Sequence, residues 1–447
     1  MNKLSIIMLS LGLIPALGFA QAEKEKNISG KLTLEECISY ALNNQPNVRL
    51  ANIDKEIVER EINTQLADWL PQVRADGSYT RNLVIGSNVA NIGGEPVIIR
   101  QGLNNASNVG LIADQAIYSN ELLLASKAAK YSRQQVNQSV ENVKINTITE
   151  VSKAFYDVLL SQEQLSILDG DIVRLEKQLN DAYAQFQSGL VDKIDYKRAT
   201  ISLNSSKAQR KAVAERLVYK KSYLNQLMGT ATNSNVDLVF DDSNIAAKIA
   251  LDTTAYVAQD NRIELQQLNT QRQLQQLNVS YYKLGFLPKV SAFYNYNLNY
   301  FNDNFSNLYD RDYPASQVGL RLSIPIFQGT KRIQSLRRAE LQTEAIDITI
   351  EDQRKQINTE YDLALGTYKS NLNDWKVQGE NEDLAKEVYE TVKMQYDEGI
   401  KTYLDLITAE TDLRTTQLNY LNSLYNLLSS KVDVQKAMGT LTPTPNN

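Results

Sequence analysis

Residues 286–300 read FLPKVSAFYNYNLNY, and this stretch decides the fold. From Val290 to Tyr300, apolar and tyrosine positions alternate strictly with positions that are mostly serine and asparagine. A period of two predicts a β-strand, because successive side chains of an extended chain point to opposite faces. The strand has about the 9–11 residues that cross a bilayer when a strand is tilted. Its apolar face therefore fits contact with lipid, or with the core of a soluble protein.

The motif that precedes this strand occurs twice in the chain. Trp69-Leu70-Pro71-Gln72-Val73 matches Phe286-Leu287-Pro288-Lys289-Val290, and three further pairs follow in the same order at a separation of about 210 residues. They are Asn108–Leu111 with Gln317–Leu320, Phe186–Gly189 with Tyr396–Gly399, and Leu227–Gly229 with Ala437–Gly439. Matches that keep their order indicate duplication of a unit with two strands and several helices.

The duplication predicts the domain organisation. We expect a signal peptide (1–22), a first repeat (23–229), a linker rich in Asn and Asp (230–250), a second repeat (251–439) and a C-terminal tail (440–447). The predicted strands are about 72–84 and 108–118 in the first repeat, and about 288–300 and 316–327 in the second. Long helical hairpins are predicted at 119–228 and 330–438. The fold class is α+β, mainly α.

Four strands are too few to close a barrel. An open sheet in lipid would leave unpaired edge groups, each at a cost of several kcal/mol, so a membrane role requires closure by association. Three chains would supply twelve strands. The alternative is a half-buried soluble sheet, which shows the same alternation. The segments between the strands of each pair, 86–105 and 302–314, are polar and rich in Gly or Asn, which predicts external loops.

The predicted helices are too long for a compact globule. Residues 119–187 lack proline and hold one glycine, Gly170, and residues 330–395 repeat this pattern with Gly366 and Gly379. A helix of that length extends roughly 100 Å and needs neighbours along its whole length. A coiled-coil seam runs through Ile172, Leu175, Leu179, Ala182 and Phe186. The last helix carries two adjacent seams, one through Leu413, Tyr420, Leu424, Leu427 and Val434, and the other through Leu418, Leu421, Tyr425, Leu428 and Val432. Two seams fit a helix in the wall of a tube, or the central helix of a bundle.

The N-terminus predicts export. Lys3 precedes an apolar run from Leu4 to Leu17, and Ala20-Gln21-Ala22 supplies a small-residue cleavage pattern after Ala20 or Ala22. Cys37 is the single cysteine, so no intrachain disulfide is possible. It lies in a predicted helix, Thr33–Asn43, where we expect it to be a small buried residue and not a lipid anchor.

Composition argues against several classes of function. The chain has no histidine, which removes the commonest general base and a frequent metal ligand. No nucleotide-binding glycine loop, nucleophile elbow or zinc spacing occurs, so we expect no enzyme, no catalytic residue, no metal site and no cofactor. A net charge of −5, with no basic stripe, also predicts no nucleic-acid partner.

The ordered motifs resemble the TolC-like outer-membrane efflux protein family over essentially all of the mature chain. Leu32–Pro46 resembles the opening helix of that family, and Leu70-Pro71 and Leu287-Pro288 match its motif before each strand. Ile324–Gly329, in which Pro325 and Gly329 stand out, resembles its strand-to-helix junction. Gly399 to Asp405 resembles the start of its final hairpin.

The resemblance implies a homotrimer in the outer membrane of a Gram-negative bacterium. Its twelve-stranded β-barrel would sit in outer-membrane lipid and continue as a periplasmic α-helical barrel, with an equatorial region of shorter elements. The implied function is a passive conduit from periplasm to exterior, for drug efflux or type I secretion. Contact with a periplasmic adaptor would open the conduit, and an inner-membrane pump of RND, ABC or MFS type would supply the energy. The runner-up is an exported periplasmic coiled-coil adaptor.

The resemblance also implies a periplasmic gate beside the hairpin turns at Gly189 and Gly399. In related channels a tyrosine and a basic residue tether one hairpin to an aspartate beside the other turn. The matching residues are Tyr396 and Lys401, with Asp195 as the acceptor. A lysine stands where the family usually has arginine, which gives up bidentate geometry.

A ring of carboxylates at the constriction is the second implied feature. Asp405 matches the position of that ring, whereas Thr408 stands where the family can carry a second aspartate, so a ring in this chain would be thinner. Convergence of three like charges would raise some of the carboxylate pKa values. The alternative for these residues is ordinary helix capping or solvated surface charge.

Overall fold

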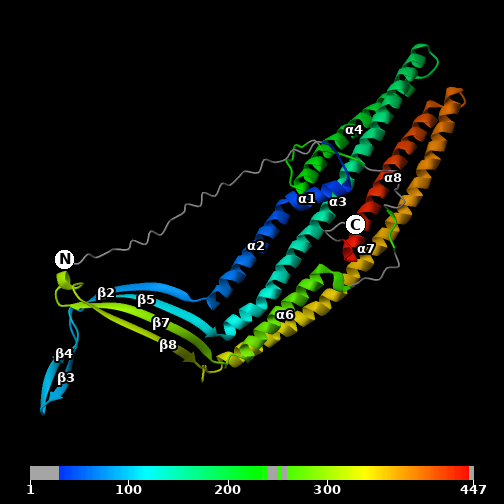
Figure 1. Cartoon of the computed structure of the whole chain (residues 1–447). Helices are drawn as coiled ribbons and strands as arrows, with labels where there is room; N and C mark the ends of the chain where they lie inside the picture. Colours follow the sequence, from blue (N-terminus) through cyan, green and yellow to red (C-terminus); the bar gives the residue numbers. More distant parts are fainter. Residues whose placement is uncertain (1–29, 235, 240–248, 253–258, 442–447) are drawn as a thin grey trace.

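The computed structural model describes residues 30–234, 236–239, 249–252 and 259–441 (Figure 1). The predicted signal peptide, 1–22, lies outside these ranges, as do most of the predicted C-terminal tail and part of the predicted linker. A β-sheet forms one end of the elongated molecule, and two long helical hairpins extend to the other end.

The main sheet has four antiparallel strands in the order β2-β5-β7-β8. They are β2 (Gln72–Arg81), β5 (Asn105–Tyr118), β7 (Lys289–Asn302) and β8 (Asp312–Ser323). One strand pair comes from each repeat, and β5 and β7 join the pairs with Leu111 opposite Tyr296. The strands are therefore close to the stretches that alternation predicts.

The register gathers the apolar residues on one face of this sheet. Val109 lies opposite Leu298, and Tyr294 lies opposite Val318. These side chains are solvent-exposed in the single chain, with Val318 at 79% and Leu320 at 72%. Asn108 and Asn299 lie on the other face and share a hydrogen bond of 2.7 Å. A contiguous exposed apolar face of this kind requires contact with lipid or with a partner protein.

The strand ends and the first loop differ from the prediction. β8 ends at Ser323, so the expectation that the strand continues to 327 is wrong, and Pro325 explains this because it cannot donate to the ladder. The predicted loop 86–105 contains a hairpin of β3 (Ser87–Ile92) and β4 (Glu95–Arg100). Gly93 and Gly94 have φ of 70° and 95°, which suits the tight turn that joins these strands.

Two hairpins of long helices form most of the molecule. Hairpin 1 consists of α3 (Asn120–Gln187) and α4 (Lys193–Met228), and hairpin 2 consists of α7 (Lys331–Asp397) and α8 (Tyr403–Ala437). Of the predicted seam of α3, Leu175 and Ala182 are buried. Of the predicted seams of α8, Leu413, Leu427, Leu428, Val432 and Val434 are buried. No helix among the described residues is long and apolar enough to cross a membrane.

The remaining described elements are shorter than these four helices. They are β1 (Gly30–Leu32), α1 (Leu34–Asn44), α2 (Pro46–Leu66), η1 (Ala67–Trp69), β6 (Val236–Leu238), η3 (Gln259–Asn261), α6 (Ile263–Lys283) and, in the β7–β8 loop, η4 (Phe305–Asn307). β6 pairs in parallel with β1, so the predicted linker returns to the start of the chain. Cys37 is fully buried among Phe155, Leu224 and Met228, as expected for a small core residue.

The duplication is visible in the packing of two equivalent glycines. Gly229 ends α4 with φ of 74°, and a Cβ there would lie 2.4 Å from the carbonyl oxygen of Asn44. Gly439 follows α8 with φ of 69°, and its Cβ would lie 3.3 Å from the carbonyl oxygen of Asn261. Each glycine therefore closes a hairpin against the segment just before a shorter helix, α2 or α6.

Candidate functional site

Each chain is an open wall with two different edges. The strands run from β2 to β8, and α3 packs between α4 and α8 while α8 packs against α7. Nearer the sheet the sequence of neighbours is α2, α3, α6 and α7. One edge therefore carries β2, α2 and α4, and the other carries β8 and α7, in every layer of the molecule (Figure 1).

Both edges expose apolar side chains at helical spacing. On α7 they are Ile333, Leu341, Ile348, Leu363, Val377, Leu384 and Val388. On the opposite edge they are Leu50, Ile53 and Ile57 of α2, and Ile194, Ile201 and Val218 of α4. Leu341 and Ile348, like Val377 and Leu384, are seven residues apart, which is the heptad spacing of a coiled-coil seam. The two edges are suited to packing against each other in a ring of copies.

The far ends of the hairpins have equivalent turns. Gly189 has φ of 75°, and the N–H of Leu190 donates to the carbonyl oxygen of Gln185 at 2.9 Å. Gly399 has φ of 73°, and the N–H of Ile400 donates to the carbonyl oxygen of Gln395 at 2.8 Å. Both glycines adopt the left-handed backbone conformation that commonly ends a helix, in which the following N–H donates to a carbonyl oxygen of the last helical turn. The two tips are thus built alike.

The structure brings two of the three predicted gate residues into one region. Burial raises the pKa of Tyr396, and the charge of Asp195 raises it further, so these side chains are electrostatic neighbours. An interaction with the side chain of Gln185 on α3 acts in the opposite direction and lowers the pKa of Tyr396. Within the described part of the chain, the carboxylate of Asp195 makes no hydrogen bond or ion pair. Lys401 acts on Asp405, whose pKa it helps to lower, and forms no ion pair with Asp195.

Of the predicted ring residues, Asp405 takes part in capping α8, whereas Thr408 bonds within the helix. Thr402 is the N-cap of α8, and its backbone N–H and hydroxyl both donate to Oδ2 of Asp405, at 3.0 and 2.7 Å. These hydrogen bonds hold the pKa of Asp405 below its usual range in the single chain, opposite to the shift expected from three converging carboxylates. The hydroxyl of Thr408 donates to the carbonyl oxygen of Leu404 at 2.8 Å.

The strand-to-helix junction lies where the motif predicts a change of direction. Pro325 is in the extended segment between β8 and α7, and Gly329 has φ of 60°. The N–H of Lys331, the first residue of α7, donates to the carbonyl oxygen of Gln328 at 3.3 Å. Proline suits this segment because no ladder hydrogen bond is needed there.

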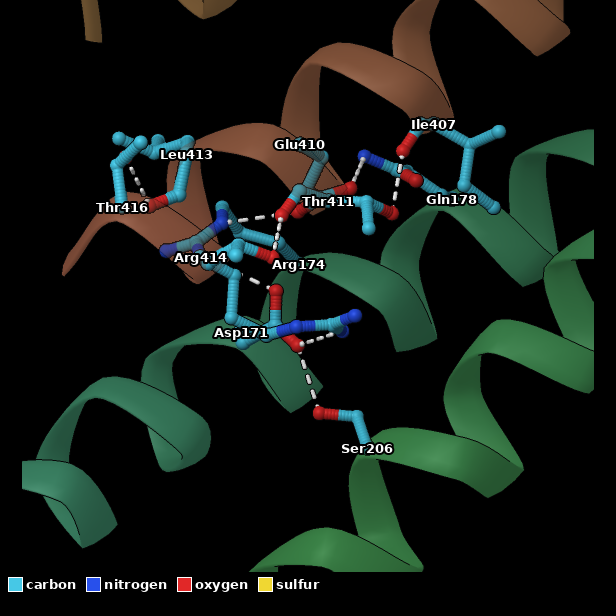
Figure 2. Close-up of polar contacts among 11 residues, drawn as sticks. Asp171, Arg174, Gln178, Ser206, Ile407, Glu410, Thr411, Leu413, Arg414 and Thr416 are labelled. Atoms are coloured by element: carbon cyan, nitrogen blue, oxygen red, sulfur yellow. Dashed lines mark hydrogen bonds and ion pairs between the residues drawn. The ribbon is translucent and has the colours of Figure 1, made fainter. Parts of the chain in front are cut away.

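A buried charge cluster between the hairpins was missed by the sequence reasoning (Figure 2). Nη1 of Arg414 on α8 lies 3.0 Å from Oδ2 of Asp171 on α3, and Nε of Arg174 on α3 lies 3.0 Å from Oε1 of Glu410 on α8. The Asp171 and Glu410 side chains are almost completely buried. Glu410 occupies a buried position near Leu406 and Leu413, and a charge at such a position in a seam was the available signal.

Neutral side chains complete this cluster. The hydroxyl of Ser206 on α4 donates to Asp171 at 2.6 Å, and Nε2 of Gln178 donates to Glu410 at 2.7 Å. Burial raises the pKa of Glu410 despite the adjacent Arg174 guanidinium. Oε1 of Gln178 is buried without a hydrogen-bond partner. No group of three or more His, Cys, Asp or Glu side chains suited to a metal ion occurs in the described ranges.

Comparison with known proteins agrees with this architecture. Residues 37–230 and 254–440 match the family model described as "Outer membrane efflux protein". The outer membrane protein TolC of Vibrio cholerae is 20% identical over 91% of this chain and 91% of its own length. The solvent efflux pump outer membrane protein SrpC of Pseudomonas putida is 22% identical over 93% of this chain and 87% of its own length.

Solved structures share the fold. The crystal structure of CusC has a TM-score of 0.73 at 17% identity and covers 91% of each chain. The Campylobacter jejuni CmeC outer membrane channel also has a TM-score of 0.73, at 18% identity, over 94% of this chain and 90% of its own. The predicted fold class, α+β and mainly α with a duplicated strand-pair and hairpin unit, is confirmed.

Proposed function

The chain belongs to the outer membrane efflux protein family, and from this premise we propose that it is one third of a passive trimeric conduit from the periplasm to the exterior. Proteins of this family are outer-membrane channels of Gram-negative bacteria that extend into the periplasm, and they are not enzymes. The chain accordingly catalyses no reaction and conducts solutes that another protein drives.

The observation that carries the proposal is the pair of unlike edges. An edge with β2, α2 and α4 that packs against an edge with β8 and α7 gives a head-to-tail contact, which closes into a ring when the rotation fits. Three copies of the four-stranded sheet would form a barrel of twelve strands without a free edge. The exposed apolar face of the sheet would then meet lipid.

The proposed partners are those that membership of the efflux family implies. A periplasmic adaptor would contact the hairpin tips, and an inner-membrane pump of RND, ABC or MFS type would drive transport. The adaptor alternative for the chain itself is set aside, because the relatives that span most of this chain are outer membrane proteins.

The gate of the conduit lies at the hairpin tips. The charge of Asp195 acts on Tyr396, and the Asp195 carboxylate makes no hydrogen bond or ion pair within the described residues, so it is available to a neighbour. Lys401 is exposed and can reach such a carboxylate on an adjacent hairpin. A hydroxyl and an ammonium that donate to one carboxylate contribute about 1–3 kcal/mol, which is small enough for a switch. Asp405 and Thr408 would line the constriction just inside this tie.

Planar-bilayer recording of the purified protein tests both statements. Asp195→Ala, or Tyr396→Phe combined with Lys401→Ala, is expected to increase single-channel conductance. Lys193→Ala removes a lysine from the other hairpin tip and should leave conductance unchanged. A wild-type protein that forms no pores would refute the conduit. If the protein forms pores but none of the three gate substitutions changes their conductance, the gate assignment is refuted and the conduit is still supported.

A further inference from the structure

The buried charge cluster joins the two hairpins by two reciprocal ion pairs. α3 supplies Asp171 and Arg174, α8 supplies Arg414 and Glu410, and each acid is paired with the arginine of the other helix at 3.0 Å (Figure 2). The four formal charges cancel. At this level the contact between α3 and α8 is thus a buried and electrically neutral set of charges.

A buried ion-pair contact fixes the position of one helix on the other but adds little to the free energy that holds the two helices together. An apolar contact resists separation in proportion to its area, at about 25 cal/mol per Å². Charges that leave a buried pair regain hydration, so a buried ion pair adds little net stability compared with apolar side chains of similar size. Loss of a single partner is different, because it leaves an uncompensated buried charge. The pairs therefore favour one register of α8 on α3 and still allow the helices to part.

The cluster lies close to the tips of both hairpins. Glu410 is seven residues from the start of α8 and Arg174 is thirteen residues from the end of α3, which correspond to about 10 and 20 Å along the helices. Beyond it toward the tips, the Tyr396 side chain of hairpin 2 also lies near Gln185 and Asp195 of hairpin 1. Movement of the hairpin 2 tip relative to hairpin 1 must first separate these contacts.

The equivalent positions in the second repeat carry apolar side chains. When the repeats are aligned on Gly189 and Gly399, Arg174 corresponds to Leu384 and Gln178 to Val388. Both residues are exposed on the α7 edge, at 60% and 51%. The contact between hairpins of one chain is thus ionic at the level where the contact offered to the next chain is apolar.

We propose that the Asp171–Arg414 and Arg174–Glu410 pairs form a releasable interlock, which sets the register of hairpin 2 on hairpin 1 and separates when the periplasmic end opens. The apolar edge of α7 stays with the neighbouring chain during this movement. The link between this interlock and opening of the channel rests on the proposed function. The interlock itself is a property of the fold that can be measured without transport.

Hydrogen exchange in the detergent-solubilised protein measures the interlock directly. Arg174→Ala leaves Glu410 buried without its arginine, so backbone exchange in segments 168–178 and 404–416 should increase at least tenfold. Lys207→Ala is the matched control, because it breaks the exposed Lys207–Glu176 ion pair within hairpin 1 and leaves both buried pairs in place. Its exchange should stay within about twofold of wild type. If Arg174→Ala does not assemble, Arg174→Gln with Glu410→Gln removes the pair without a buried charge.

Conductance tests whether the interlock must separate. A variant with Asp171→Leu, Arg174→Met, Glu410→Leu and Arg414→Met should exchange no faster than wild type and should remain at the resting conductance when Asp195→Ala is added. Wild-type exchange in both Arg174 variants would overturn the interlock. Opening of the apolar variant by Asp195→Ala, as in an unmodified background, would overturn its release. If the wild-type protein forms no pores, the proposed function fails, whereas the exchange result still decides whether the interlock exists.

Discussion

Gly229→Ala should damage the protein far more than other glycine-to-alanine changes at left-handed positions. Gly229 has φ of 74°, so a Cβ costs about 1–2 kcal/mol from backbone strain alone. That Cβ would also lie 2.4 Å from the Asn44 carbonyl oxygen and 2.8 Å from the Gln45 Cα, which are backbone atoms at the junction of α1 and α2. Neither atom can move without displacing a helix. Overpacking of this kind adds about 1–3 kcal/mol.

Two other glycines are graded controls. Gly399 has φ of 73° and open space around its Cβ position, so Gly399→Ala pays only the strain of about 1–2 kcal/mol. Gly439, the repeat equivalent of Gly229, would place its Cβ 3.3 Å from the Asn261 backbone, so Gly439→Ala should fall between the two. The expected order of destabilisation is Gly229→Ala, then Gly439→Ala, then Gly399→Ala.

Thermal unfolding of the detergent-solubilised variants, followed by circular dichroism at 222 nm, gives the order. Hydrogen exchange across residues 41–48 gives the local size of the effect. An extra cost of about 1–3 kcal/mol in Gly229→Ala corresponds to exchange that is roughly five to more than a hundred times faster than in Gly399→Ala. Equal melting temperatures for these two variants would refute the argument that contact with Asn44, and not φ alone, selects glycine at position 229.

Three further predictions concern the chain-to-chain edge, the cysteine and the buried glutamate. Leu341→Asp with Ile348→Asp would place two charges on the α7 edge and should abolish the trimer in size-exclusion chromatography; a stable trimer would contradict the edge assignment. Burial raises the pKa of Cys37 to about 12, so alkylation of the folded protein at pH 8 should be about a thousandfold slower than that of a free thiol; rapid alkylation without denaturant would contradict its burial. Burial also raises the pKa of Glu410 in the folded state, so stability should increase as the pH falls from neutral through that raised value and level off below the unfolded pKa. Glu410→Gln should lack this pH dependence in thermal unfolding, and an identical dependence in both proteins would show that other groups cause it.

The sequence predicted the features that have a period or a repeat. Alternation in 290–300 located β7, and the repeated Leu-Pro motif located the entry to β2 and β7. The seams of α3 and α8 predicted buried residues such as Leu175 and Leu427. These signals are strong because burial of one face constrains every second residue of a strand, or every third and fourth residue of a helix.

Features that depend on a single long-range contact were not predictable in this way. Asp171 and Arg414 lie 243 residues apart and look like ordinary solvated charges until α3 and α8 pack together. The β3–β4 hairpin was assigned to a polar loop because segment 86–105 is rich in Gly and Asn, although Val97-Ile98-Ile99 is a strand signal and Gly93-Gly94 is a hairpin turn signal. Asp405 matched a family position, and the structure shows that its carboxylate also caps α8.

The duplication explains how three copies of one chain can close every layer of the wall together. Within the chain, α3 of the first repeat meets α6 and α8 of the second, and β5 meets β7. The repeat equivalents of these elements are α7, which would meet α2 and α4 of the next chain, and β8, which would meet β2. The contact between chains therefore copies the contact within a chain, and one rotation serves the sheet and both helical layers. Near the tips the two contacts differ, because the second repeat has Leu384 and Val388 at the positions where the first repeat has Arg174 and Gln178. Under the proposed interlock, that difference would let hairpin 2 leave hairpin 1 of its own chain while its other side keeps an apolar contact with the next chain.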